Sequence, residues 1–227
     1  MNTPGCDFCS EFSGKRENLF HRIYAGNPRS RTLFQSEELV VIPSLGQIAE
    51  GYLMILPRLH FRAIGDLSYG VLSRLGTVLD WVGDVLKNEY GRCVAFEHGT
   101  RSGGVGGCGI YHAHLHAVPV ASVPDPVSTL KAAFQYEEFD NLEEIGSRSA
   151  GLLSYLFYQG TDRRLYLFDT GPLPSQYLRK LLADALHEKN WDWRRAGREE
   201  RLLATIERLS PRFDAVQKSL RSHTNGT

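Results

Sequence analysis

Residues 107–119 read GCGIYHAHLHAVP, a segment that places three histidines at every second position directly after a glycine-rich run. Side chains alternate between the two faces of a strand, so His112, His114 and His116 are expected to point the same way. The residues that alternate with them are small or apolar and are expected to face the core; they are Ala113, Leu115 and Ala117. The pattern predicts a strand over residues 110–120 with three imidazoles on one exposed face.

The histidine pattern alone allows three interpretations. It is compatible with a histidine-rich polar face, with a metal site and with a catalytic site. Burial in the core is disfavoured, because a histidine is at best an intermediate core residue and needs partners for both ring nitrogens. The rest of the chain has to decide between the three.

The composition is that of an ordinary globular protein. Of the 227 residues, 42% are hydrophobic and 23% are charged, and 26 basic residues balance 26 acidic ones. A formal charge of zero gives no global field that would collect nucleic acid or anionic membrane. No window approaches the roughly 18 to 20 apolar residues of a membrane span, and the N-terminus lacks the features of a secretory signal. We therefore expect a cytoplasmic protein with neither a membrane nor a nucleic acid as a stable partner.

The first half of the chain predicts an α+β fold. Short apolar runs bounded by proline or glycine predict strands over residues 39–42 and 52–56. Apolar residues then recur at three- and four-residue steps over residues 71–86, which is typical of an amphipathic helix. Two more strands are expected over residues 92–99 and 110–120, with a glycine loop between them. This order favours a mostly antiparallel sheet flanked by helices.

Residues 123–227, here called the C-terminal extension, are expected to have α/β character. An acidic helix or linker, a hairpin and two helices are predicted in this order over residues 124–146, 152–171, 174–190 and 198–213. The extension is either a small domain of its own or a part of the sheet formed by residues 1–122.

The segment HAHLHAV at residues 112–118 resembles the His-X-His-X-His-X-X signature of the histidine triad family of nucleotide hydrolases and transferases. CDFC at residues 6–9, LVVIPSLGQIAEGYLMILPRLH at residues 39–60 and the glycine loop occur in the order and at the spacing of that family. The resemblance extends over residues 6–120 and leaves the C-terminal extension outside it. It implies a histidine triad fold for residues 1–122.

The resemblance implies a catalytic role for the middle histidine. His114 would attack the α-phosphorus of a nucleoside phosphate ester, anhydride or phosphoramidate and form a covalent nucleotidyl-histidine intermediate. A neutral imidazole is a good nucleophile near pH 7 when a hydrogen bond at its other nitrogen fixes the tautomer. His116 is expected beside the phosphate oxygens, where it stabilises negative charge. Whether water or another acceptor takes the nucleotidyl group stays open, so both a hydrolase and a transferase or phosphorylase are compatible with the sequence.

Residues upstream of the triad are predicted to contact the phosphate. Backbone amides of Gly107, Cys108 and Gly109 are expected to donate to it. Family members often have Gly-Gln-Ser or Gly-Gln-Thr at these three positions, so a hydroxyl that could protonate a leaving group is missing. Glu97 stands where the family commonly has Asn or Gln, and a carboxylate there repels an anion unless it is turned away or protonated. The neighbouring His98 is then expected to contact the phosphate in place of residue 97.

Four residues outside this segment are also predicted to bind substrate. The family places the base against the first strand pair, which here contains Phe34 and Ile42. In the C-terminal extension, Gln176 and Arg179 lie at the start of a predicted helix. An arginine there is suited to binding a second phosphate or an acceptor anion.

A structural metal site is predicted at the N-terminus. Cys6 and Cys9 have the two-residue spacing that suits one tetrahedral ion. Some bacterial members of the family bind zinc through two such cysteines, the histidine after the second strand and the first histidine of the triad, which here are His60 and His112. Four protein ligands close the shell, so the expected cofactor is a structural Zn²⁺.

Two other hypotheses belong to different classes. Glu97 and Cys108 depart from the family pattern and suggest a catalytically weak, zinc-dependent nucleotide-binding or interaction protein. Alternatively, all three triad histidines bind one catalytic ion. Many relatives are dimers, so a homodimer is a further expectation.

Overall fold

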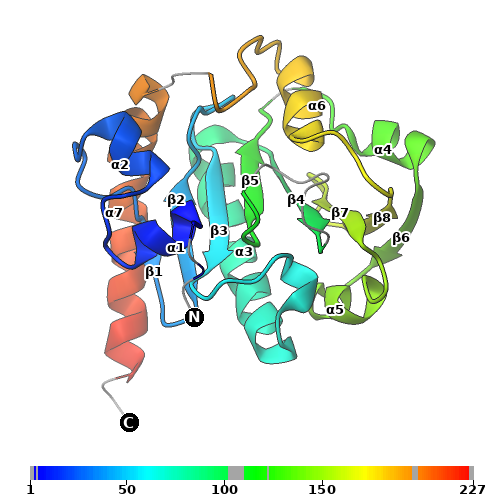
Figure 1. Cartoon of the computed structure of the whole chain (residues 1–227), viewed down its shortest axis with the longest axis horizontal. Helices are drawn as coiled ribbons and strands as arrows, with labels where there is room; N and C mark the ends of the chain where they lie inside the picture. Colours follow the sequence, from blue (N-terminus) through cyan, green and yellow to red (C-terminus); the bar gives the residue numbers. More distant parts are fainter. Residues whose placement is uncertain (1–2, 4, 102–109, 122, 196–198, 225–227) are drawn as a thin grey trace.

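The computed structural model describes residues 3, 5–101, 110–121, 123–195 and 199–224 (Figure 1). One eight-stranded sheet runs through the molecule in the order β1-β2-β3-β5-β4-β7-β8-β6, and its strand pairs are antiparallel. The strands are β1 (Phe34–Gln35), β2 (Leu39–Pro43), β3 (Leu53–Pro57), β4 (Cys93–Thr100), β5 (Leu115–Pro119), β6 (Gln135–Phe139), β7 (Ser154–Gln159) and β8 (Leu165–Asp169). The predicted α+β class with a mostly antiparallel sheet is confirmed.

The helices lie on both faces of this sheet. They are α1 (Asp7–Phe12), α2 (Leu19–Tyr24), α3 (Tyr69–Tyr90), α4 (Val127–Ala133), α5 (Ile145–Arg148), α6 (Tyr177–Ala185) and α7 (Glu199–Thr224), with short 3₁₀ turns at Ile64–Asp66 and Leu142–Glu144. The long helix predicted around residues 71–86, the hairpin β7–β8 and the two helices of the C-terminal extension are all present.

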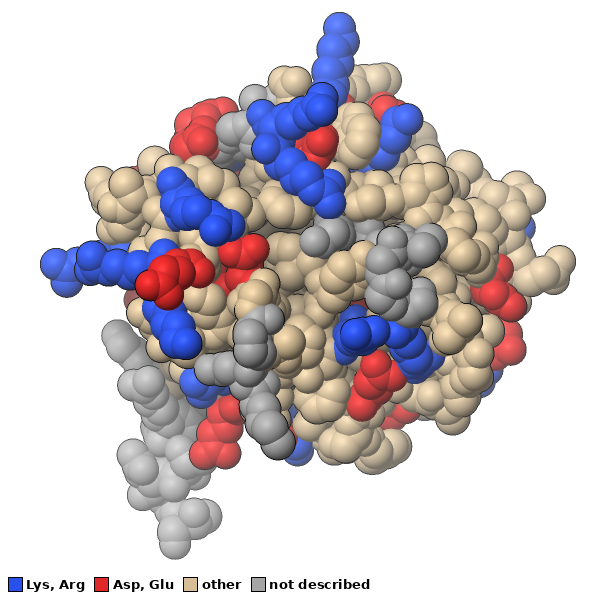
Figure 2. All heavy atoms as spheres, in the orientation of Figure 1, with Lys and Arg blue, Asp and Glu red and all other residues tan. Residues whose placement is uncertain are grey.

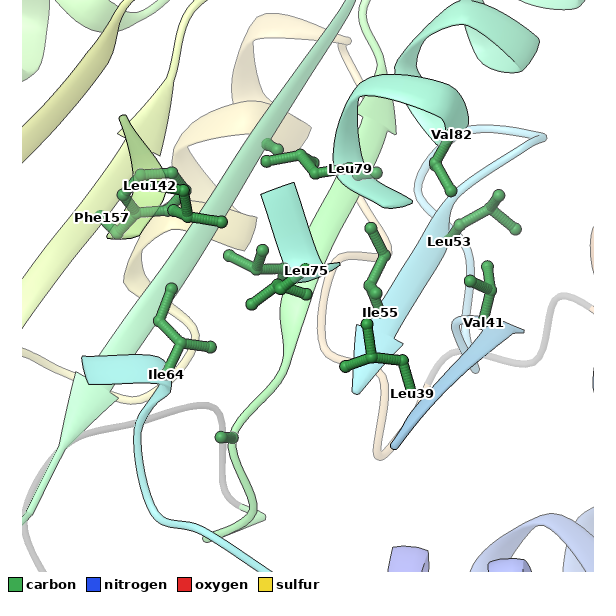
Figure 3. Close-up of a cluster of buried hydrophobic side chains, with 14 of the residues drawn as sticks. Leu39, Val41, Leu53, Ile55, Ile64, Leu75, Leu79, Val82, Leu142 and Phe157 are labelled. Carbon is green, nitrogen blue, oxygen red and sulfur yellow. The ribbon is translucent and has the colours of Figure 1, made fainter. Parts of the chain in front are cut away.

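One face of the sheet is a continuous apolar core. Leu75, Leu79 and Val82 lie on one side of α3 and pack against β2 and β3, where Val41 and Ile55 point toward them (Figure 3). These side chains are fully or almost fully buried, and each contributes roughly 1.5–3 kcal/mol by leaving water. The core also contains Ala113, Leu115 and Ala117, so the predicted inward set of the histidine segment is confirmed.

The opposite face is divided between the two ends of the chain. Helix α1 packs on β2 and β3 through Phe8, beside Ile42 and Met54. Helix α6 packs on β4, β5, β7 and β8 through Leu178 and Leu182. Figure 1 shows α1 and α6 on either side of β5, so the strand that carries the histidines lies between these two covers.

The C-terminal extension continues the sheet. Strand β7 pairs with β4 over six residues, from Ala95↔Gln159 to Thr100↔Ser154. Gly99 is required at this junction, because a Cβ atom there would lie 2.3 Å from the Tyr155 ring. Both sides of β4 are therefore paired within the chain, to β5 and to β7.

Two segments differ from the sequence prediction. The strand expected over residues 110–120 is shorter, because β5 begins only at Leu115, and Ala113 instead donates its backbone N–H to the Phe61 carbonyl at 2.7 Å. The segment predicted as an acidic helix or linker contains α4 followed by the edge strand β6. Most of β6 is exposed, so it lacks the alternation of apolar and polar residues that marks a half-buried strand.

Candidate functional site

The three triad histidines are buried, which corrects the expectation of an exposed face. His112, His114 and His116 are 1%, 7% and 4% exposed. Phe8 of α1 covers the first two, with ring centroids 5.6 Å from His112 and 5.8 Å from His114. The cover comes from a segment more than one hundred residues away in the chain, which strand alternation cannot indicate.

One hydrogen bond fixes the tautomer of His114. Its Nδ1 lies 2.5 Å from the backbone carbonyl oxygen of His112. A carbonyl only accepts, so Nδ1 carries the proton and Nε2 keeps its lone pair. Burial lowers the pKa of His114. The ring is therefore neutral near pH 7, with one nitrogen that can act as a nucleophile.

His116 lies directly beside this nucleophile. The two ring centroids are 4.6 Å apart. The Nδ1 of His116 is 2.8 Å from the hydroxyl of Tyr52, and its ring stacks on Phe96 at 4.5 Å. Burial, with smaller contributions from nearby positive charge, holds the pKa of His116 well below its usual value. The imidazole is thus a neutral, oriented hydrogen-bonding group.

A pocket with His114 and His116 in its lining has a cavity volume of about 40 Å³, within about 500 Å³ of non-atom space that includes open solvent. It lies between α1 and the C-terminal extension. Its apolar lining residues come from widely separated segments and are Phe8, Leu19, Leu45, Met54, Ile110 and Trp193. Apolar walls with a few polar anchors are typical of sites for small molecules.

The C-terminal extension supplies polar groups to the same pocket. Arg179 of α6 and Gln176, which precedes α6, both line it and are both 3% exposed. Gln176 donates to Asp192 at 2.9 Å and accepts from the backbone N–H of Trp193 at 3.3 Å. The two residues predicted from the extension are therefore brought together with the triad.

Two predicted substrate contacts lie on the other face of the sheet. Phe34 belongs to the α3 core, where it packs edge-to-face on Trp81 at 5.2 Å. Glu97 accepts from the backbone N–H of Ile64 at 2.8 Å and from the Tyr155 hydroxyl at 2.6 Å. Alternation along β1 and β4 turns both side chains away from His114. Ile42 lies on the histidine face, in the cluster with Phe8, but outside the pocket lining.

Burial changes the protonation of Glu97. It raises the pKa of this carboxyl group to about 8, although the Tyr155 and Ile64 hydrogen bonds act in the opposite direction. The carboxyl is therefore largely protonated near neutral pH. The repulsion between Glu97 and a bound phosphate that the sequence suggested does not arise at this position.

His98 follows Glu97 and has the opposite orientation. Its two ring nitrogens are buried and have no hydrogen-bond partner among the described residues. Burial, followed by the charge of a protonated His114, lowers its pKa to about 4. His98 is thus a neutral imidazole on the histidine face. The predicted phosphate contacts Gly107, Cys108 and Gly109 lie outside the described residues.

The four predicted metal ligands converge. One ligand atom from each of Cys6, Cys9, His60 and His112 can be chosen so that all four lie within 4.8 Å of one another. The Nε2 of His112 lies 2.8 Å from the carbonyl oxygen of Pro57, so Nε2 carries the proton and Nδ1 is free to bind a metal. That Nδ1 faces the two sulfur atoms at 3.5 and 3.7 Å. The cluster could hold one metal ion with four protein ligands.

Sequence reasoning missed most of the pocket wall. Phe8 lies inside the CDFC motif, yet its role became visible only with the position of α1. The contact of Trp193 with the site depends on the fold of residues 186–195. Arg31 and Glu11, which also line the pocket, carried no sequence signal.

Comparison with known proteins points to one family. Residues 17–128 match the family described as "Scavenger mRNA decapping enzyme C-term binding". An uncharacterized HIT-like protein of Chlamydia muridarum (strain MoPn / Nigg) is 26% identical over 106 residues, which are 45% of this chain and 81% of that protein. With the histidine motif of residues 112–118, these matches support membership of the histidine triad (HIT) family.

Several solved structures are also similar to this chain. A HIT family protein from Bacillus anthracis is 20% identical and covers 51% of this chain and 73% of its own, with a TM-score of 0.39. A zinc-bound histidine triad family protein from Mycobacterium smegmatis is 18% identical and covers 51% of this chain and 74% of its own, with a TM-score of 0.38.

The surface carries no dominant charge on the face that Figure 2 shows. Lysine and arginine side chains are interspersed there with aspartate and glutamate side chains. Within the described part of the chain, no helix is both long and apolar enough to span a membrane.

Proposed function

We propose that this protein binds nucleotides and cleaves a bond at the α-phosphorus of a nucleoside phosphate ester, anhydride or phosphoramidate. The nucleophile is Nε2 of His114, and the intermediate is a covalent nucleotidyl-histidine. The observation that carries the proposal is the 2.5 Å contact between His114 Nδ1 and the His112 carbonyl, which leaves a neutral ring with its Nε2 lone pair free beside a pocket.

In the first step, the Nε2 lone pair forms a bond to phosphorus while the bond from phosphorus to the leaving group breaks. The leaving group departs with the bonding electron pair. The positive charge that the imidazole gains is stabilised by its Nδ1–H bond to the His112 carbonyl. His116, at 4.6 Å between ring centroids, is positioned to donate to a phosphoryl oxygen.

In the second step, an acceptor oxygen attacks phosphorus and the nitrogen–phosphorus bond breaks. Its electron pair returns to Nε2 and restores the neutral imidazole, and the acceptor releases its proton. Water as acceptor gives a nucleoside monophosphate, whereas inorganic phosphate gives a nucleoside diphosphate. Product analysis with nucleoside phosphoramidates and dinucleoside polyphosphates, with and without phosphate, therefore separates hydrolase from phosphorylase activity.

The metal held by Cys6, Cys9, His60 and His112 is proposed to be a structural Zn²⁺. Tetrahedral zinc with bonds of about 2.3 Å to sulfur and about 2.05 Å to nitrogen separates these atoms by about 3.6 Å. The observed sulfur–nitrogen distances of 3.5, 3.5 and 3.7 Å fit this geometry. Bound zinc would tie residues 5–12, here called the N-terminal arm, to the sheet and thereby keep Phe8 over His114.

The orientation of Glu97 bears on the alternative of a nucleotide-binding protein with weak catalysis. Its carboxyl group is bonded to Tyr155 and Ile64 on the far face of the sheet. This departure from the family pattern therefore does not argue against catalysis. Binding without turnover of every substrate in the panel would favour the alternative.

A further inference from the structure

Four charged side chains line the pocket, and three of them have ionic partners. Asp7 lies 3.3 Å from Arg22, and Glu11 accepts two hydrogen bonds from Arg31 at 2.8 and 2.7 Å. The fourth, Arg179, has no carboxylate partner among the described residues, although it is almost completely buried. Among the described residues, the pocket lining therefore contains one buried positive charge without a counter-ion.

The present partners of Arg179 are neutral. Its Nε donates to the Trp191 carbonyl at 2.5 Å, and its Nη2 donates to the carbonyls of Leu45, at 3.4 Å, and Gly46. Its Nη1 has only a 3.5 Å contact with the Ser44 hydroxyl. A guanidinium carries five N–H groups, so Nη1 retains hydrogen-bonding capacity. A buried cation without an anion is costly, and an anionic ligand removes that cost.

Arg179 is also on the correct side of the triad. Its guanidinium carbon lies 5.1 Å from the centre of the Tyr52 ring. The hydroxyl of the same tyrosine is 2.8 Å from Nδ1 of His116. The cation therefore borders the part of the pocket where the proposed function needs the phosphoryl oxygens.

We infer that Arg179 binds the phosphoryl oxygens of the nucleotide beside His116, so that the C-terminal extension completes the phosphate site. This inference rests on the proposed function and deepens it. It assigns phosphate recognition to a charged group on α6, in addition to any backbone donors of the triad segment. It also selects ligands that carry phosphate over the corresponding nucleosides.

The test compares Arg179→Gln with Arg201→Gln. Arg201 is a matched control, because it also comes from the extension and donates to carbonyls of the same loop, those of Gln47 and Ile48, each at 3.0 Å. It differs by having a carboxylate partner, Glu188 at 2.9 Å, and by lying outside the pocket lining. Calorimetry would measure the affinity of each variant for inorganic phosphate, the four nucleoside 5′-monophosphates and the four nucleosides.

Arg179→Gln is expected to weaken binding of the monophosphate that binds best by about 10- to 100-fold and to leave nucleoside affinity unchanged. Arg179→Lys should retain part of the phosphate affinity, and Arg201→Gln should retain all of it. Unchanged monophosphate binding in Arg179→Gln, or an equal loss in Arg201→Gln, would overturn the inference. So would a wild-type protein that binds monophosphates no better than nucleosides.

If Arg179→Gln does not fold, NMR of the wild-type protein still tests the inference. Its arginine side-chain NMR signals, with that of Arg179 assigned through Arg179→Lys, should shift on saturation with the monophosphate. A saturated protein with an unshifted Arg179 signal contradicts the inference. Monophosphate binding that depends on Arg179 but is accompanied by no adduct on His114 would reject the proposed chemistry and leave this inference intact.

Discussion

The N-terminal arm and the C-terminal extension cover the same face of the sheet but are attached to it in different ways. The arm is attached by four thiol and imidazole groups whose ligand atoms lie within 4.8 Å of one another. The extension is attached by the pairing of β7 with β4 and by hydrogen bonds from buried polar side chains, such as Arg179 to Gly46 and Thr205 to Gln47. A metal cluster requires particular residue types at particular spacings, whereas a carbonyl accepts a bond from any donor. The first attachment is therefore visible in the sequence, and the second is not.

Two histidines of the triad, His112 and His114, also differ from each other, in which ring nitrogen carries the proton. His112 donates from Nε2 to Pro57 and turns Nδ1 toward the cysteines. His114 donates from Nδ1 to His112 and leaves Nε2 available to the pocket. Opposite tautomers thus leave Nδ1 of His112 free toward the cysteines and Nε2 of His114 free toward the pocket, which disfavours one ion bound by all three triad histidines.

The largest effect is expected from removing the residue between the two covers. His114→Asn should lower turnover by about 10⁴-fold or more, because no other group supplies the nucleophile. Its melting temperature should stay close to the wild-type value. Initial rates with a phosphoramidate substrate, together with thermal melts, provide the measurement. A residual rate within tenfold of wild type would contradict the assignment.

The next effect separates the arm from the extension. Cys9→Ser should abolish stoichiometric metal binding and lower the free energy of unfolding by at least about 3 kcal/mol, since metal binding is coupled to folding. Cys93→Ser is the control, because Cys93 lies outside the cluster. Elemental analysis and denaturant unfolding would measure both quantities. Equal metal content in the two variants would show that the cluster is not a metal site.

A smaller effect is expected from the buried ion pair between Glu11 of the N-terminal arm and Arg31. Glu11→Gln leaves Arg31 buried without a carboxylate and should destabilise the protein by about 2–3 kcal/mol. Glu138→Gln removes one of the two exposed carboxylate partners of Arg164 and should cost less than about 1 kcal/mol. Urea unfolding of both variants tests the difference. Equal stabilities would mean that the buried pair contributes no more than a surface pair.

The last effect compares the two faces of the sheet through the pH dependence of stability. The folded-state pKa of Glu97 is raised from 4.5 to about 8, so its contribution to stability is complete below pH 4.5 and is lost as the pH rises toward 8. Wild type should therefore lose stability relative to Glu97→Gln across this range, by at most about 1.4 kcal/mol per pH unit. The pH dependence of turnover should be the same in both proteins, because Glu97 faces away from the pocket. Parallel stability curves, or a shifted activity profile, would contradict this orientation.

Much of the fold could be predicted from the sequence, because it follows from local patterns. The three- and four-residue apolar steps of α3, the short apolar runs of β2 and β3, and the hairpin β7–β8 depend on neighbouring residues alone. The burial of His114 and the edge strand β6 could not be predicted in this way. Both depend on which distant segment covers, or fails to cover, the position.

In the candidate site, too, features set by local sequence could be predicted, and features set by distant segments could not. The spacing of Cys6 and Cys9 and the alternation of the triad histidines were visible in the sequence, and the resemblance to the HIT family supplied His60 and the roles of His112 and His114. The predicted substrate contacts of Phe34 and Glu97 were wrong, because strand alternation turns both side chains toward α3 and away from His114. Arg179 was identified by its residue type near a helix start, but its unpaired charge is visible only in three dimensions.

The central claim is that the Nε2 atom of His114 forms a bond to phosphorus, and trapping that bond tests it most directly. Wild-type protein mixed with nucleoside phosphoramidates and dinucleoside polyphosphates, quenched within the first turnover, should gain the mass of one nucleotidyl group. Peptide mapping should locate this group on His114, and His114→Asn should gain no such mass. A protein that turns over these substrates without any adduct, or with the adduct on another residue, would contradict the account.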